Sequence, residues 1–465
     1  MQQEGFGKDV LTALAVCLCA GAGWYATKLP IGIALGLLPF GAMFVFRQPF
    51  LLVVMFVCFS FFRIHEAYPQ LYPLRIPQML ALAVLASLVW KLWSRQVTTF
   101  MTKELKLFLV FFLIITFDVV MATNVGEAKA YWTGTFSKIA LMVFVIAWLV
   151  TDTQQVKVAA RIFVLCGIAV AAVAIFNKHA GIGLVEGTRV TISRAMGSML
   201  GDPNDLSLVL TFPISFATAL AIGPAMKKTD RLLGIIALPI LLLGVVYTQS
   251  RGGLLGSMAV FGVFGWNHVR NKFLLVGVGV VAAIVLFLLA GVGDRAVVAA
   301  SDSAVDESSM GRLYAWGAAW NMALANPITG VGLNNFYPNY YFYSSHWDGK
   351  NHAVHSTWFG VLAESGFVGL GVFIALVVAS ARLAMRSLAS LYKQKGNQEA
   401  LALGGTLEGL LAGLAGFAAS GTFLTMGFVW PFYILFALIV ATSRIASCIL
   451  RDAPLQDASR SAPPR

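Results

Sequence analysis

The chain of 465 residues is 58% hydrophobic and only 12% charged, and it carries a formal net charge of +12. Soluble globular proteins have about 25% charged residues, so this composition excludes a soluble enzyme and a soluble nucleic-acid-binding domain. Apolar runs of about 17–25 residues, long enough to cross a bilayer as helices, recur along the chain. We therefore predict an all-α integral membrane protein, whose basic residues report its topology and contact membrane lipids.

Fourteen apolar segments are candidates for membrane-spanning helices. They cover residues 10–26, 29–46, 50–62, 78–93, 105–122, 136–151, 159–176, 204–222, 232–248, 254–267, 273–291, 357–381, 404–424 and 428–449. The segments 50–62 and 254–267 are short for a bilayer, so we predict a polytopic bundle of about 12 transmembrane helices.

Short loops rich in Lys and Arg predict which side of the membrane faces the cytoplasm. Four clusters alternate correctly with the spans, namely Arg95 with Lys103 and Lys106, Lys227 with Lys228 and Arg231, Arg270 with Lys272, and Arg382 with Arg386, Lys393 and Lys395. Both termini are then cytoplasmic. The opposite side receives loops 63–77, 123–135, 177–203 and 292–356, and we expect the active site there because it holds the longest loop.

This topology divides the chain into four parts. Residues 1–291 form N-terminal transmembrane helices, and residues 292–356 form a long, partly helical periplasmic loop. Residues 357–450 form the C-terminal transmembrane helices. Residues 451–465 form a polar, proline-rich cytoplasmic tail that we expect to be disordered.

The residue pattern predicts no cofactor and no metal site. The five cysteines are scattered through apolar runs without the spacing of metal ligands. The outer loops contain no Asp-x-Asp motif, and the acids Asp302, Asp306 and Glu307 are typical of a solvated linker.

Seven arginines stand on the predicted outer side of the membrane, where the topology rule expects few. They are Arg63, Arg75, Arg189, Arg194, Arg251, Arg295 and Arg312. Pairing with lipid headgroups, or with acids such as Glu66, Glu186 and Asp302, explains any single one of them. Together they favour a site for a lipid that carries phosphate or pyrophosphate, because a guanidinium binds phosphate oxygens bidentately.

Two of these arginines lie in short motifs. Arg251 interrupts two apolar segments in YTQSRGGLLG, where the glycine pair is predicted to turn the backbone sharply and bring the guanidinium close to a ligand. Arg194 precedes the Asp-Pro-Asn sequence at 202–204, a pattern that predicts the start of a helix. The N-terminus of a helix favours anions.

The long loop combines a helix, a turn and an aromatic cluster. Residues 312–325 are predicted to be helical and to end at Asn326 and Pro327, and GVGLNNF reads as a glycine-rich turn. The sequence YPNYYFYSSHW that follows favours a carbohydrate site, because aromatic faces stack on sugar rings. An aromatic belt at the membrane interface is an equal alternative.

These motifs resemble the O-antigen ligase superfamily of bacterial membrane proteins over about residues 190–440. The matching elements are Arg194 with Gly197, Asp202-Pro203-Asn204, Ser250-Arg251-Gly252-Gly253, Arg312 with NPITGVGLNNF, and VHSTWFGVLAESGFVGLG. In the last element His355, Ser356 and Trp358, followed by a Glu364-Ser365-Gly366 turn, fit the family pattern.

The resemblance implies a metal-independent glycosyltransferase of the bacterial inner membrane with a periplasmic active site. Its donor is a glycan linked to undecaprenyl pyrophosphate. Ligases of the family pass the glycan to the lipid A core, polymerases pass it to another lipid-linked glycan, and oligosaccharyltransferases pass it to Ser or Thr of proteins. We favour the ligase, because the chain is compact and the long loop is of moderate size.

The implied reaction assigns roles to individual residues. His355 is the predicted general base, since a histidine with a pKa near 6.5 suits that work; a capping or interfacial histidine is the alternative. Arg251 and Arg194 are expected to neutralise the leaving pyrophosphate. Further substrate contacts are expected from Arg189, Arg312, Asn204, Asn335, His352, Tyr337 and Trp358.

A transporter or flippase for a lipid-linked sugar is the alternative from another class. A translocation path would place charged residues inside the spans. Asp118 and Glu408 are the candidates, and their positions fit span ends as well.

Overall fold

The computed structural model describes residues 15, 18, 22, 25, 45, 47–67, 74–289 and 304–460. The predicted segments 10–26 and 29–46 fall almost entirely outside these residues. The chain divides into two compact units, one of Met1–Phe56 with Pro77–Thr98 and one of Val57–Ile76 with Thr99–Arg465. The described part of the smaller unit includes the start of α3 (Pro49–Ser60) and most of α5 (Ile76–Trp93).

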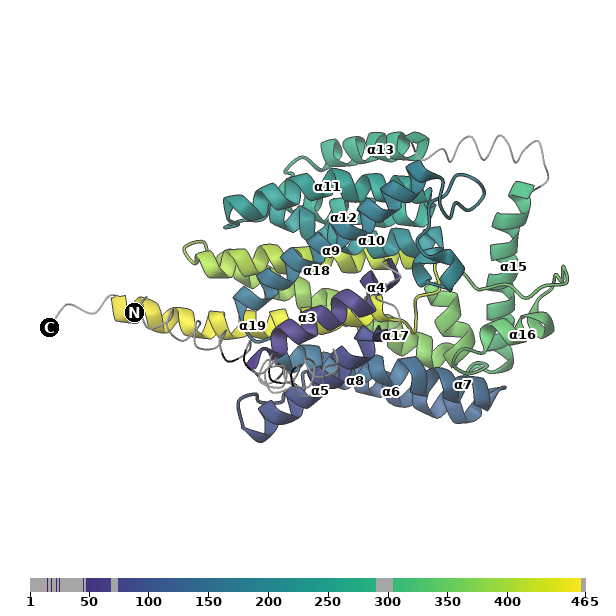
Figure 1. Cartoon of the computed structure of the whole chain (residues 1–465), viewed down its shortest axis with the longest axis horizontal. Coiled ribbons are helices and arrows are strands. Elements are labelled where there is room, and N and C mark those ends of the chain that lie inside the picture. Colours follow the sequence, from purple (N-terminus) through teal and green to yellow (C-terminus); the bar gives the residue numbers. More distant parts are fainter. Residues whose placement is uncertain are drawn as a thin grey trace. The chain divides into compact units, whose positions relative to one another are not determined.

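The larger unit is helical throughout its described residues, apart from turns and one isolated bridge between Val185 and Arg189. Its helices are α4 (Ile64–Ala67), α6 (Lys103–Met121), α7 (Val125–Tyr131), η2 (Trp132–Phe136), α8 (Ser137–Leu149), α9 (Thr153–Ala180), η3 (Arg194–Met196), η4 (Met199–Gly201), α10 (Pro203–Ile222), α11 (Lys228–Thr248), α12 (Arg251–His268), α13 (Lys272–Leu289), α15 (Ala304–Ala325), α16 (Phe336–Tyr343), α17 (Thr357–Lys393), α18 (Gln398–Gly421) and α19 (Trp430–Arg460). In Figure 1, α10, α11 and α17 to α19 run along one direction, and α15 runs across it.

Eight helices of the described residues are long and apolar enough to cross a membrane. They are Ile76–Trp93, Val125–Leu149, Thr153–Ala180, Pro203–Ile222, Lys228–Thr248, Thr357–Lys393, Gln398–Gly421 and Trp430–Arg451. The all-α, multi-pass membrane architecture is thereby confirmed. The apolar helices Pro49–Ser60 and Lys272–Val285 are shorter, and the number of about 12 spans stays a prediction.

Two sequence-based boundaries differ from the structure. Residues 123–135 were expected as a loop, yet Val125–Leu149 is one helical run in which η2 joins α7 to α8. The segment is apolar enough to continue the following span, so the charged residues Glu127 and Lys129 do not interrupt it. The tail was expected to be disordered from residue 451, whereas α19 continues to Arg460.

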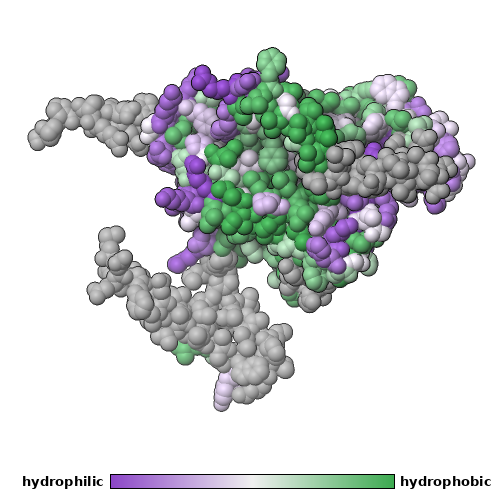
Figure 2. All heavy atoms as spheres, turned by 90° about the horizontal axis from the view of Figure 1, so that it is seen from above, coloured by the Kyte–Doolittle hydropathy of each residue, from purple (hydrophilic) through white to green (hydrophobic). Residues whose placement is uncertain are grey.

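Successive helices alternate in direction, so their connections gather at two ends. We call the end that holds residues 122–124, 181–202, 249–250 and 422–429 the site end; the other holds 150–152, 223–227, 269–271 and 394–397. Figure 2 shows apolar residues over the flank of this unit, with hydrophilic residues gathered toward its ends. This distribution is the one a bilayer requires.

The centre of the unit is α10, which is buried along most of its length and packs against α9, α11, α12 and α18. Small residues allow the close approach of α18. A Cβ atom on Gly409 would lie 2.9 Å from the Ala219 Cβ atom, and one on Gly416 would lie 2.8 Å from Thr211 Cγ2. Close packing of this kind holds helices together where lipid removes the hydrophobic driving force. It fixes the N-terminus of α10 at the site end.

The long loop docks onto α17 at a kink. Gly366 has φ +66° inside the helix, and the backbone N–H of Phe367 donates to the Pro327 carbonyl (2.9 Å). A side chain at Gly366 would meet that carbonyl oxygen at 2.6 Å. The Glu364 carboxylate accepts from the backbone N–H groups of Asn334 (2.9 Å) and Phe336 (3.3 Å). The predicted acid-Ser-Gly turn therefore exists, and it anchors the predicted GVGLNNF turn.

Candidate active site

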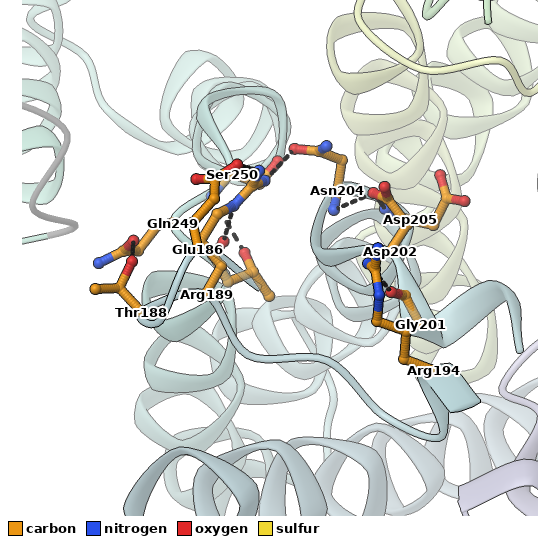
Figure 3. A network of polar contacts seen from close by, with 11 residues as sticks. Glu186, Thr188, Arg189, Arg194, Gly201, Asp202, Asn204, Asp205, Gln249 and Ser250 are labelled. Carbon is orange, nitrogen blue, oxygen red and sulfur yellow. Dashed lines mark hydrogen bonds and ion pairs between the residues drawn. The ribbon is translucent and has the colours of Figure 1, made fainter. Parts of the chain in front are cut away.

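The start of α10 brings a carboxylate to the site end. Asp202 is the N-cap residue, and its Oδ1 atom accepts hydrogen bonds from the backbone N–H groups of Asn204 (2.7 Å) and Asp205 (3.3 Å) (Figure 3). Pro203 follows in the first turn. The helix start predicted at 202–204 is thus confirmed, and its capping bonds fix the position of the Asp202 carboxylate.

Arg189 is held in place by three groups from different segments. Its Nε atom donates to the Thr248 carbonyl (3.2 Å), and one terminal nitrogen donates to Asn204 Oδ1 (2.8 Å). The other terminal nitrogen lies 3.8 Å from the Glu186 carboxylate. The side chain is only 12% exposed. The guanidinium is therefore oriented before any ligand arrives, and Asn204 serves as one of its supports (Figure 3).

Arg251 is the first residue of α12, directly after the turn from α11. Gln249 makes that turn in the left-handed conformation (φ +51°), and Ser250 caps the helix by accepting from the Gly253 N–H (3.2 Å). The turn was predicted at Gly252 and Gly253, which instead lie inside the helix. A Cβ atom on Gly253 would lie 2.4 Å from Ser207, so close packing on α10 requires this glycine.

The Arg251 side chain is exposed. No hydrogen bond of its guanidinium is found among the described residues. It lies close enough to Arg189 and Arg312 for its charge to lower the pKa of both. An exposed, unbonded guanidinium beside two others is available to a ligand.

Arg189, Arg251 and Arg312 form a group that we call the arginine cluster. Burial lowers the pKa of Arg189 first, and the charges of Arg312 and Arg251 lower it further, whereas Glu186 and Asp202 raise it. The pKa of Arg312 is likewise lowered by burial and then by Arg251. Three mutually repelling cations, partly withdrawn from water, favour a polyvalent anion between them.

His355 stands directly before the N-cap residue of α17. Its backbone is in the left-handed region (φ +45°), a conformation that histidine, asparagine and aspartate adopt more readily than other residues. Ser356 caps the helix through the Phe359 N–H, and Thr357 donates to the Leu424 carbonyl (2.8 Å). The half-buried imidazole itself makes no hydrogen bond within the described residues, so both ring nitrogens are available.

The surroundings of His355 keep its ring neutral. Burial lowers its pKa from the ordinary value, and the positive charge of Arg312 lowers it further, while Asp202 acts in the opposite direction. A pKa below 6.5 leaves the imidazole as a base at neutral pH. Of the arginine cluster, Arg312 is thus within electrostatic range of His355, as is Asp202.

Arg194 and His352 are engaged elsewhere. Arg194 is exposed and donates to the Gly201 carbonyl (3.1 Å), on the other side of α10's first turn from Arg189 in Figure 3. No contact joins it to the arginine cluster in the described residues. The His352 ring contacts Asp348 Oδ2 (2.9 Å) and packs edge-on against Tyr340. Their predicted catalytic and substrate-binding roles stay predictions.

Three further predicted substrate contacts have separate positions. The fully buried Asn335 side chain accepts from Thr123 and the Asn124 N–H and donates to the Asn124 and Leu333 carbonyls, which uses all its hydrogen-bonding capacity. Trp358 donates to Thr422 (3.1 Å) inside the bundle. Tyr337 is exposed on α16. These contacts favour a structural role for Asn335 and Trp358 and leave Tyr337 open to a ligand.

Of the remaining arginines of the outer set, one pairs with an acid as the simpler interpretation expects, Arg75 is exposed, and one lies outside the described residues. Arg63 pairs with Glu66, whose carboxylate also accepts from Ser198. Arg295 and Asp302 fall outside the described part of the chain.

Two residues gain importance that the sequence pattern did not assign. Asp202 was predicted only as a helix cap, and its charge acts on Arg189, Arg312 and His355. Glu364 was recognised only as a motif position, and it anchors the long loop. Pairing of an N-cap acid with nearby arginines is the signal that could have indicated the first.

A comparison with protein families matches residues 236–374 to the family described as O-antigen ligase. This range contains Arg251, Arg312 and His355 and ends inside α17. A comparison with curated proteins gives no match.

Proposed function

Because this chain belongs to the O-antigen ligase superfamily, we propose that it transfers a glycan from undecaprenyl pyrophosphate to a sugar hydroxyl of the lipid A core. The site end faces the periplasm in this proposal, and the protein lies in the bacterial inner membrane with both termini in the cytoplasm. The basic residues at the opposite end, such as Lys227, Lys228 and Arg270, support that orientation.

The arginine cluster, whose member Arg312 is within electrostatic range of His355, is the observation that carries the proposal. In the reaction the acceptor oxygen bonds to the anomeric carbon, the bond from that carbon to the phosphate oxygen breaks, and pyrophosphate leaves with the electron pair. Arg251 and Arg312 carry charges with no carboxylate bonded to them in the described residues, so they suit the leaving group. Arg189, already oriented by Asn204 and Thr248, completes the anion site.

His355 supplies the base. It takes the proton of the acceptor hydroxyl as that oxygen attacks, and its lowered pKa keeps it ready at neutral pH. The pyrophosphate carries its own charge and needs cations, not a proton, to leave.

The acceptor distinguishes this function from its relatives of the same fold. A polymerase would join the glycan to a second lipid-linked glycan, and a protein oligosaccharyltransferase would use Ser or Thr. A transporter has less support at Glu408, whose carboxylate is already bonded to Asn267, His268 and Tyr392. The other candidate, Asp118, is buried in α6, and its Oδ2 atom makes no hydrogen bond among the described residues.

The test is transfer in vitro with the purified protein and lipid-linked glycan, offered lipid A core in one reaction and an unfolded protein rich in Ser and Thr in a second. A glycosylated core is the expected product. Elongated lipid-linked glycan together with unmodified lipid A core would identify a polymerase. A glycosylated protein acceptor, with neither modified core nor elongated glycan, would identify an oligosaccharyltransferase.

We expect the activity to be independent of divalent metal. The arginine cluster provides the positive charge that a metal ion supplies in other pyrophosphate-releasing sites. Initial transfer rates should therefore be unchanged in excess EDTA. Loss of transfer in EDTA, with recovery on adding Mg²⁺ or Mn²⁺, would refute this assignment of the arginines.

The pH dependence should respond in opposite directions to two neighbours of His355. Arg312 lowers its pKa, so Arg312→Gln should raise that pKa and move the acidic limb of kcat/KM to higher pH. Asp202 raises it, so Asp202→Asn should move the limb to lower pH. Asparagine caps helices as well as aspartate does, which keeps α10 intact. If the acidic limbs of the two variants move in the same direction, or do not move, then the group that titrates in kcat/KM is not His355.

A further inference from the structure

Helix α15, which carries Arg312, has an apolar face that packs against the protein. The buried residues of this face are Ala315, Ala318, Ala319 and Met322. Beside them Trp316 stacks on Phe359 of α17 with ring centroids 5.2 Å apart, and its indole N–H donates to the Val354 carbonyl (3.1 Å). One side of α15 is thus firmly attached to the beginning of α17.

The opposite side of α15 is also apolar, and it is exposed. Leu313, Trp320 and Leu324 are 53%, 46% and 57% exposed. Their spacing of seven and four residues places them in one stripe at 3.6 residues per turn, about half a turn away from Ala315 and Met322. An aqueous surface rarely carries such a stripe, because contiguous exposed apolar area marks an interaction site.

The stripe joins a surface that already faces lipid. Trp320 contacts Phe367 of α17 edge-on, with ring centroids 5.5 Å apart. Phe367, Val368 and Ile374 are exposed apolar residues of Thr357–Lys393, a helix long and apolar enough to span the membrane. In Figure 1, α15 crosses the direction of α17 at the site end. The exposed apolar side of α15 is therefore continuous with the exposed apolar side of α17, although the two helices run in different directions.

We propose that α15 is an interfacial membrane helix whose exposed stripe lies in the leaflet at the site end. A helix that is apolar on two opposite sides needs a partner on each, and here one partner is α17 and the other is lipid. Tryptophan at the middle of the stripe fits the region of the headgroups. Lipid explains why the stripe is continuous with the exposed apolar surface of α17, whereas a glycan or a protein partner would not require this continuity.

The position of α15 has a consequence for the reaction, and this step rests on the proposed function. Arg312 precedes Leu313 and therefore lies about 100° around the helix from the stripe, between the stripe and the buried face. The bilayer would therefore hold Arg312 at the level of the headgroups, where the pyrophosphate of a lipid-linked donor lies. The leaflet itself then helps to place one member of the arginine cluster.

The experiment measures immersion directly and needs no substrate. Nitroxide labels are placed on Leu313→Cys and Leu324→Cys in a variant without the native cysteines, reconstituted in vesicles of bacterial phospholipid. Power saturation with oxygen and with a water-soluble nickel chelate gives the depth of each label. Lys350→Cys in the exposed part of the same loop is the matched control in water, and Ile374→Cys on α17 is the control in lipid.

Labels at both α15 positions should lie about 5–10 Å below the headgroup boundary, shallower than the label at 374. The label at 350 should be in water. The proposal would be overturned if the nickel chelate reached both α15 labels as readily as it reaches the label at 350. Because transfer activity is not measured, this result is independent of whether the protein is a glycosyltransferase.

Discussion

Substitution of His355 should abolish transfer while leaving the protein folded and inserted. Loss of a general base lowers kcat by about 10²–10⁴-fold. The ring makes no hydrogen bond among the described residues, so its removal deletes no structural contact of that kind. His355→Asn is the cleaner variant, because asparagine tolerates the left-handed backbone that His355 adopts, and His355→Ala should give the same loss with some backbone strain. Initial rates of glycan transfer by purified, vesicle-reconstituted protein provide the measurement.

The matched control is His352→Asn, three residues earlier in the same loop. The His352 ring is bonded to Asp348 and packs on Tyr340, so its loss should change transfer only a few-fold if its role is local. Near-normal transfer by well-inserted His355→Asn and His355→Ala would eliminate His355 as the base. A large loss in His352→Asn alone would transfer that role to His352.

Local sequence rules predicted those parts of the fold that local chemistry decides. The apolar runs identified the long spans, because a helix must satisfy its own backbone in lipid. The Asp-Pro-Asn sequence at 202–204 predicted the start of α10, since a capping side chain and a proline in the first turn act within a few residues. The turn of Glu364 to Gly366 was expected from the family resemblance instead, and the structure has a non-helical Gly366 there.

Features that depend on distant partners were not predictable in this way. Gly253 was interpreted as a turn residue, and the structure gives it a packing role against Ser207 of α10. Asn335 was expected to contact substrate, and its bonds go to Thr123 and Asn124, more than 200 residues earlier in the chain. A single sequence contains no signal for either contact.

The candidate site shows the same division. The types of residue were available from the sequence, because arginines on the outer side suggested a phosphate-bearing ligand and the family motif indicated His355. Their grouping did not follow: the charges of Arg312 and Arg251 lower the pKa of Arg189, and the charge of Arg251 lowers the pKa of Arg312, whereas Arg194 bonds to Gly201 apart from them. The directions of α10, α12 and α15 determine this grouping, and those directions are a property of the packed bundle.

The second large effect is expected at Arg251. Its guanidinium is exposed at the first residue of α12 and repels Arg189 and Arg312, so an anion bound there relieves the repulsion. Arg251→Ala should lower transfer by about 10²–10³-fold, as for removal of one donor to a developing oxyanion. Arg251→Lys keeps the charge but loses the planar pair of donors, and it should lower transfer by about 10–100-fold.

Competition with free undecaprenyl pyrophosphate measures the effect of Arg251 on donor binding apart from the chemical step. Binding should weaken in both Arg251→Lys and Arg251→Ala, more strongly in the latter. Arg270→Ala removes an equally exposed arginine beyond the opposite end of α12 and should leave binding and transfer unchanged. Wild-type binding and turnover in Arg251→Lys would mean that the position supplies only positive charge, since lysine provides a point charge without the bidentate geometry. Equal losses in Arg251→Lys and Arg270→Ala would instead place the effect in the stability of α12, because the two residues share only that helix and its ends.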